Sequence, residues 1–130
     1  MTVDTFDPSA MAQPLDAQMA VALCAAAEIS ADNELVLAEL DVKRFAPIAA
    51  GGDWSALDDE LSDEQVLQLI RIFTLGEMQF SSWAAGDKSP VIVLVQLLKQ
   101  RGVYDPEMTR WIKSNTTNRF LPHGNLLNRL

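Results

Sequence analysis

The sequence predicts an all-α fold, a compact bundle of about five helices plus a short C-terminal helix. Apolar residues recur at spacings of three and four over much of the chain, which is the period of a helix buried on one face. Several of these stretches also open with a capping residue. A chain of 130 residues can bury one self-sufficient core. We therefore expect residues 1–13 to form a mobile, flexible tail and residues 14–130 to form a single helical domain.

The first half of the chain predicts two helices. Pro14 suits the first position of a helix, and an apolar stripe of Leu15, Met19, Leu23 and Ala26 follows it. Residues 34–44 suit a second helix capped by Asn33, although their alternation leaves a strand open as the alternative. Pro47 and two glycines after it mark the end of this region and the start of a loop.

The clearest helix begins at Ser62. Ser62 and Gln65 form a capping-box pattern, and the acids between them favour the positive end of the helix dipole. The apolar residues from Val66 to Phe80 cover nearly every face, which is typical of a central helix. Gly76 would kink this helix or leave room for a neighbour.

Two further helices follow. Ser89 and Pro90 give a start signal and Gly102 an end signal, although the β-rich composition of residues 91–98 leaves a buried strand open. Asp105 and Pro106 repeat the start signal ahead of a stripe of Met108, Trp111, Ile112 and Asn115. Residues 125–130 predict the short terminal helix.

The three tryptophans fall into two groups. Trp111 lies on an apolar stripe, which predicts a core position. Trp54 and Trp83 lie in or beside loops, where a tryptophan either pins the loop to the core or contacts a partner. We expect pinning for both.

Charge is divided between the two halves of the chain. Residues 1–65 hold fourteen acids and two bases, and residues 66–130 hold four acids and eight bases, so the halves carry −12 and +4 and the chain −8. This asymmetry indicates a charged partner, or one half covering the other. The net negative charge disfavours a nucleic acid as the partner because phosphate repels it.

Several classes of protein are disfavoured. Cys24 is the only cysteine, so no intrachain disulfide forms, and Cys24 and His123 alone do not make a zinc site. The acids from Asp53 to Glu64 lack the spacing of a calcium loop. We therefore expect no metal and no cofactor. No apolar run is long enough to span a bilayer, and the residues before position 19 lack the bases of a signal peptide, so we expect a cytoplasmic protein without membrane contact.

The most unusual stretch is Asn115-Thr116-Thr117-Asn118-Arg119, five consecutive residues with hydrogen-bonding side chains. It follows two bases and could form a donor-rich surface for an anion or a partner. The alternative is a solvated loop whose side chains satisfy turns and free carbonyls. The candidate partner- or anion-binding residues are Arg110, Lys113, Asn115, Thr117, Asn118, Arg119 and His123.

These observations predict an interaction, regulatory or accessory protein that binds another protein through its basic, Asn/Thr-rich C-terminal surface. A homo-oligomer also remains open. One alternative is a nucleic-acid-binding domain in which the helices beginning near Ser89 and Asp105 form a helix-turn-helix pair. Its bases would be Lys99, Arg101, Arg110, Lys113, Arg119 and Arg129. A second alternative is a small enzyme with His123 as acid or base, although the sequence shows no catalytic pattern and we assign no catalytic residue.

Overall fold

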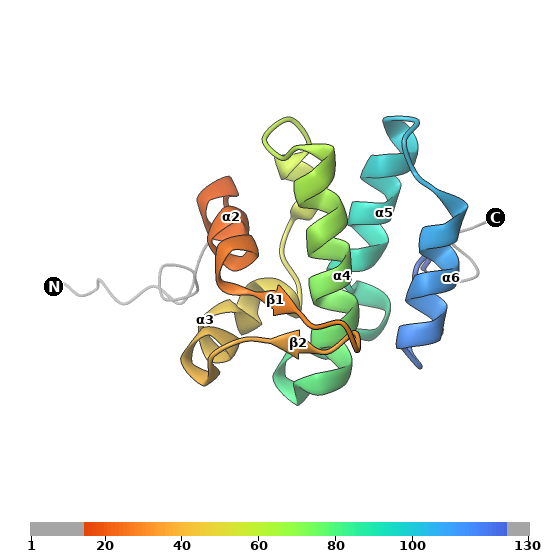
Figure 1. Ribbon diagram of the computed structural model, residues 1–130. Coiled ribbons are helices and arrows are strands. Elements are labelled where there is room, and N and C mark those ends of the chain that lie inside the picture. Colours follow the sequence, from red (N-terminus) through yellow and green to blue (C-terminus); the bar gives the residue numbers. More distant parts are fainter. Residues whose placement is uncertain (1–14, 125–130) are drawn as a thin grey trace, which may run out of the picture.

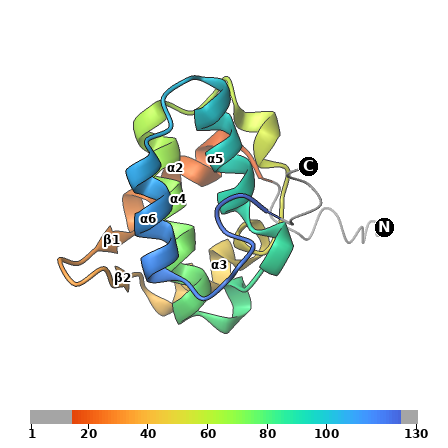
Figure 2. The ribbon, with the colours of Figure 1, turned by 90° about the vertical axis from the view of Figure 1, so that its right-hand side faces the viewer.

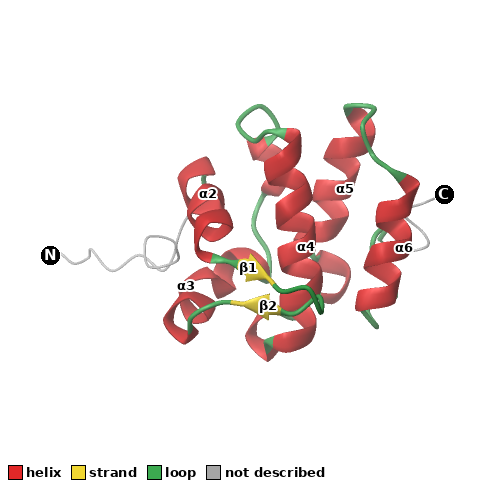
Figure 3. Ribbon diagram, in the orientation of Figure 1, coloured by secondary structure: helices red, strands yellow, loops and turns green. Residues whose placement is uncertain are grey.

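The computed structural model describes residues 15–124, and in that range the chain is mostly helical. Its five α-helices are α2 (Ala17–Ala26), α3 (Glu39–Ala49), α4 (Asp63–Gln79), α5 (Pro90–Gln100) and α6 (Pro106–Asn115). One small hairpin joins β1 (Glu28–Ile29) to β2 (Leu35–Val36). Helix α4 is central, with α2 and α3 on one side of it and α5 and α6 on the other, and the hairpin crosses in front of its lower half (Figure 1; Figure 3). The all-α prediction is confirmed, with the hairpin as an addition.

Three predictions fall outside the described residues. They are the tail at 1–13, the helix start at Pro14 and the terminal helix at 125–130. The first described helix, α2, begins after Asp16, whose carboxylate accepts a hydrogen bond from the Met19 N–H at 2.8 Å. Met19 and Leu23 are buried as the apolar stripe predicts, but Ala27 completes the buried face in place of Ala26.

The prediction of one helix over residues 34–44 is wrong for its first part. Asn33 has a positive φ of 58° and turns the chain back instead of capping a helix, a conformation that asparagine adopts more readily than most residues. The Ser30 hydroxyl closes the turn by accepting hydrogen bonds from the N–H groups of Asp32 and Glu34. Leu35 is then buried and Val36 exposed, which is the alternation of a strand.

Helix α3 begins after Ala38 and runs past Pro47, which the sequence placed at the helix end. Pro47 lies in the last turn and is exposed, as is Lys43, whose carbonyl would have been its hydrogen-bond acceptor. A proline costs least where the carbonyl that it leaves unpaired stays accessible to solvent. Phe45, Ile48 and Ala49 form the buried face of α3.

Helix α4 carries the predicted capping box, with Ser62 and Gln65 each bonding the other's backbone N–H. Gly76 does leave room for a neighbour, because the six-membered ring of Trp83 packs directly against its Cα. The Trp83 indole N–H donates to the Val42 carbonyl at 2.9 Å, which ties the end of α4 to α3. Trp54 is equally buried, and its indole N–H donates to the Ile48 carbonyl at 3.1 Å. Both tryptophans pin loops, as predicted.

Residues 91–98 are helical, so the buried strand that the sequence left open for them is not formed. Helix α5 begins at the predicted Ser89–Pro90 signal, and Gly102 follows it with a φ of 75°. Helix α6 begins at Pro106 with Asp105 as its cap. Helices α4, α5 and α6 run in alternating directions (Figure 1). Beyond α6 the chain passes back across α5 (Figure 2), where Gly124 lies against Ile92.

Trp111 departs from its predicted core position. Met108 and Ile112 are the buried residues of α6, whereas Trp111 is half-buried. Successive helical residues are rotated by about 100°, so Trp111 lies at the edge of the face that Ile112 buries. The Trp111 side chain therefore reaches the surface between α6 and α4.

Candidate functional site

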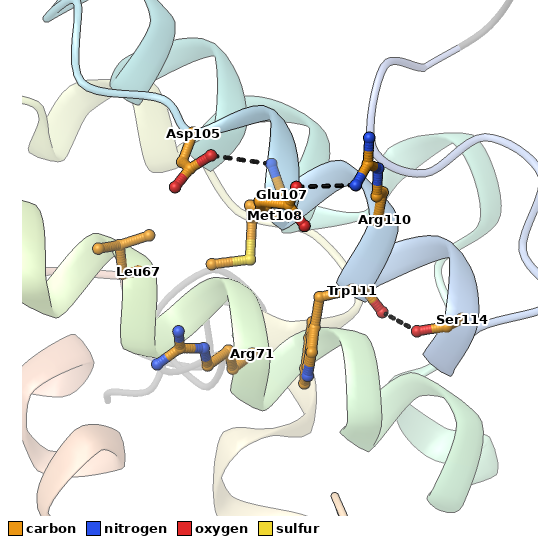
Figure 4. Close-up of a pocket in the computed structure, with 8 residues that line it drawn as sticks. All are labelled: Leu67, Arg71, Asp105, Glu107, Met108, Arg110, Trp111 and Ser114. Carbon is orange, nitrogen blue, oxygen red and sulfur yellow. Dashed lines mark hydrogen bonds and ion pairs between the residues drawn. The ribbon is translucent and has the colours of Figure 1, made fainter.

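A groove of about 620 Å³ lies between α4 and α6, and we call it the α4–α6 groove. Figure 4 shows Met108 and Trp111 pointing from α6 toward α4, with Leu67 and Arg71 on the α4 side of the opening. Its lining residues are Leu67, Arg71, Asp105, Glu107, Met108, Arg110, Trp111 and Ser114. The groove therefore has an apolar floor and a charged rim.

The apolar floor forms because α4 and α6 each place a half-buried apolar side chain at the groove. Leu67 belongs to α4, which is apolar on several faces, and stays half-buried beside the groove. Trp111 offers the large, partly exposed surface of an indole from the facing helix. A half-buried tryptophan beside apolar neighbours is typical of a contact residue in a protein interface.

Most charges on the rim are already paired within the chain. Asp105 caps α6 by accepting from the Glu107 N–H at 2.9 Å, and Glu107 forms an ion pair with Arg110 at 2.8 Å. Within residues 15–124, Arg71 is the one charged side chain of this groove without an ion pair or hydrogen bond. It is exposed, so the rim presents one cation that nothing in the described part of the chain neutralises.

A second cavity, of about 530 Å³, adjoins the groove on the side of the hairpin. We call it the hairpin cavity, and it shares Leu67 and Arg71 with the α4–α6 groove. Its other lining residues are Ala27, Glu28, Ile29, Glu64 and Gln68. Arg71 therefore lies between two adjoining cavities on the same face of α4.

The residues predicted from the sequence are divided among separate parts of the surface. Arg110 lines the α4–α6 groove, whereas Lys113, two residues beyond Trp111 and rotated about 200° from it, faces away from the groove and is exposed. Arg119 is exposed on the segment after α6. His123 is half-buried, with its Nδ1 2.9 Å from the Nζ of Lys99 on α5.

The predicted amides form internal hydrogen bonds. Asn115 donates to the Trp111 carbonyl at 2.8 Å and so satisfies the end of α6. Asn118 donates to the Gly86 carbonyl at 3.0 Å and accepts from the Phe120 N–H at 3.0 Å. These two side chains therefore hydrogen-bond the backbone of turns and helix ends, which was the alternative predicted for this segment.

Thr117 and Asn118 also line a third cavity, of about 270 Å³, together with Glu77. The Glu77 carboxyl group is buried and accepts hydrogen bonds from the Ser89 hydroxyl and, at 3.5 Å, from the Asn118 amide. Burial raises the pKa of Glu77 to about 7, and the two hydrogen bonds offset only part of that rise. Burial likewise raises the pKa of the Cys24 thiol to about 11, which leaves Cys24 a poor nucleophile at neutral pH.

One base of the second half does bind acids of the first half. The Arg101 guanidinium forms ion pairs with Asp58 at 3.1 Å and Asp63 at 2.8 Å. It also donates to the backbone carbonyls of Asp58 and Leu61. The hydrogen bond with Asp63 contributes most to raising the pKa of Arg101 above its ordinary value. The opposite charges of the two halves thus meet in these ion pairs, which join the start of α4 and the loop before it to the end of α5.

Two site residues were missed by the sequence argument, Arg71 and Glu77. Both lie on α4, which the sequence marked only as a central helix. A charged residue in a helix that is apolar on nearly every face is the signal that would have drawn attention to them.

No family model, curated protein or solved structure matches the chain. In the part of the chain that the structure describes, no helix is both long and apolar enough to cross a membrane. Among residues 15–124, no three His, Cys, Asp or Glu side chains are grouped as a metal site would require.

Proposed function

We propose that this chain is a protein-interaction domain that binds an exposed segment of a partner protein in the α4–α6 groove. The observation that carries the proposal is Arg71, a cation with no partner among residues 15–124, beside an apolar floor that includes the half-buried Trp111. Tryptophan and arginine are the residues that most often dominate the free energy of binding in protein interfaces. The proposal places the protein in the cytoplasm, in a regulatory or accessory role.

The chemistry of the groove defines the partner segment. The partner segment carries an apolar side chain that covers Trp111 and Met108, and a carboxylate that pairs with Arg71. Arg110 is exposed at the rim, where it is paired with Glu107, and Lys113 is exposed on the part of α6 that faces away from the groove. Arg71 is therefore the cation that the groove offers to a carboxylate, while Asn115 and Asn118 serve to hold the backbone.

Two substitutions test this function. Arg71→Glu reverses the charge and Trp111→Ala removes the apolar contact, and Lys43→Glu is the matched control because it makes the same charge change on an exposed part of α3. Each variant is used as bait in an extract of the native host, after circular dichroism has shown native helix content. We expect one partner to be captured by the wild type and by Lys43→Glu, with at least a tenfold loss for Arg71→Glu and Trp111→Ala.

A photo-crosslinking amino acid at Ser114, on the rim of the groove, then locates the captured partner. Crosslinks from Ser114 that Arg71→Glu abolishes support the proposal. A partner that is captured equally by the wild type and Arg71→Glu, or that crosslinks only from a position such as Lys43 on α3, contradicts it.

A further inference from the structure

One of the two short edges of the hairpin has no hydrogen-bonding partner among the described residues. The described sheet contains only β1 and β2. The Ser30 N–H donates to the Glu34 carbonyl at 2.9 Å, and hydrogen-bonded pairs alternate with non-bonded pairs along an antiparallel ladder. The Ile29–Leu35 pair is therefore the non-bonded one. The backbone N–H and C=O of Ile29 and of Leu35 consequently point outward, toward opposite edges of the hairpin.

The two outward edges differ in whether their backbone groups are hydrogen-bonded. On the β2 edge, the side-chain amide of Gln79 accepts from the Leu35 N–H at 2.7 Å and donates to the Leu35 carbonyl at 2.9 Å. An amide placed in this way reproduces both hydrogen bonds of a neighbouring strand. On the β1 edge, no group of the described residues bonds the Ile29 N–H or C=O. Ile29 thus offers one donor and one acceptor in strand geometry.

This open edge lies beside the proposed binding surface. Ile29 lines the hairpin cavity, and that cavity adjoins the α4–α6 groove, with Leu67 and Arg71 lining both. The charges in the hairpin cavity also follow an order, with Arg71 between the two cavities and Glu28 and Glu64 on the hairpin side. A segment lying across α4 would meet the apolar floor, then a cation, then two carboxylates and the open edge.

We infer that the partner segment binds in extended conformation and pairs with the backbone of Ile29 as an added β-strand. This inference rests on the proposed function and specifies its ligand. The segment carries an acidic side chain at Arg71, a basic side chain at Glu28 and Glu64, and a residue whose N–H and C=O bond Ile29. A helical segment satisfies its own backbone and would leave the Ile29 groups to water.

The test uses a phage-displayed library of random heptapeptides selected on the folded chain. Peptides retained by Arg71→Glu are discarded, and one that the wild type and Lys43→Glu both bind is then synthesised. In amide hydrogen exchange, we expect this peptide to slow the Ile29 amide at least tenfold. The Leu35 amide is the internal control, because Gln79 already protects it in the free protein.

A second measurement depends only on the peptide, so no variant of the hairpin has to fold. Each peptide N–H is methylated in turn, which removes one hydrogen-bond donor without changing charge. We expect binding to weaken at least tenfold at the single position that faces Ile29, because the residues on either side of it direct their N–H groups away from the β1 edge.

The outcomes separate the two proposals. A peptide that requires Arg71 but neither slows the Ile29 amide nor loses affinity on methylation overturns strand pairing and leaves the proposed function standing. If the library yields no Arg71-dependent heptapeptide, the extended segment is overturned, and capture from the host extract alone decides the proposed function.

Discussion

The buried carboxyl group of Glu77 accepts a hydrogen bond from the hydroxyl of Ser89, and that same hydroxyl accepts from the Val91 N–H at the start of α5. The end of α4 is joined in this way to the first turn of α5. Asn118, from the segment after α6, approaches the other carboxyl oxygen of Glu77. One titratable group on α4 therefore contacts two other parts of the fold, the start of α5 and the segment after α6.

Glu77 should make the stability of the protein depend on pH. Its pKa rises from an ordinary 4.5 to about 7 on folding, so its contribution is fully present below pH 4.5 and is lost as the pH rises through 7. We expect Glu77→Gln to gain stability relative to the wild type between pH 5 and 8, by at most about 3 kcal/mol. Urea unfolding across this range measures the difference, with Glu60→Gln on the surface as the control. Parallel pH profiles for wild type and Glu77→Gln would contradict this role.

Gly76→Ala should destabilise the protein although alanine favours helix. The gain in helix propensity is about 1 kcal/mol. A Cβ at position 76 would overlap the Trp83 ring, which is held by its bond to Val42 and by Phe73 and Phe80 on either side. We expect a net loss of ~1–3 kcal/mol in the free energy of unfolding, measured in urea.

Gly51→Ala is the matched control, since nothing lies within 4 Å of a Cβ at that position. It should leave stability unchanged or raise it slightly, because alanine restricts the unfolded chain more than glycine does. Equal stability of Gly76→Ala and the wild type would mean that Trp83 can move aside.

Arg101→Met should loosen the loop between residues 58 and 63. The substitution keeps much of the side-chain volume but removes hydrogen bonds to Asp58, Asp63 and the Leu61 carbonyl. Because the Arg101 side chain is only 20% exposed, we expect a loss of roughly 2 kcal/mol, detected by thermal or urea unfolding. Arg110→Met is the comparison, and its highly exposed pair with Glu107 should contribute far less. A similar loss in both variants would show that burial of the Arg101 pair adds nothing.

Local signals predicted the helices of the second half well. Ser62, Ser89 and Asp105 each begin a helix where the sequence placed them, because a cap acts through neighbouring backbone groups and needs no tertiary partner. The hairpin was preferred less than a helix for residues 34–44, and β1 was not predicted, because only two residues pair on each strand and so short an alternation also fits a helix. Asn33 and Ser30, the residues that make its turn, are also common before helices.

The candidate site was harder to predict than the fold. The sequence drew attention to Asn115 and Asn118 because five polar residues stand together, but whether the Asn118 amide faces solvent or a carbonyl depends on a contact with Gly86 that only the fold supplies. Arg71 was passed over because its importance lies in what it does not contact. The charge asymmetry indicated that bases of the second half could contact acids of the first half. It did not identify Arg101 as the base or Asp58 and Asp63 as the acids.

The placement of the three tryptophans gives the molecule an intrinsic optical reporter. Trp54 and Trp83 are 1% and 0% exposed, so their emission should be insensitive to a soluble quencher such as acrylamide. Trp111 is the one indole that solvent reaches, and it stands in the proposed binding groove. Fluorescence from the unlabelled protein thus consists of a constant background and one component that occupancy of the groove would alter.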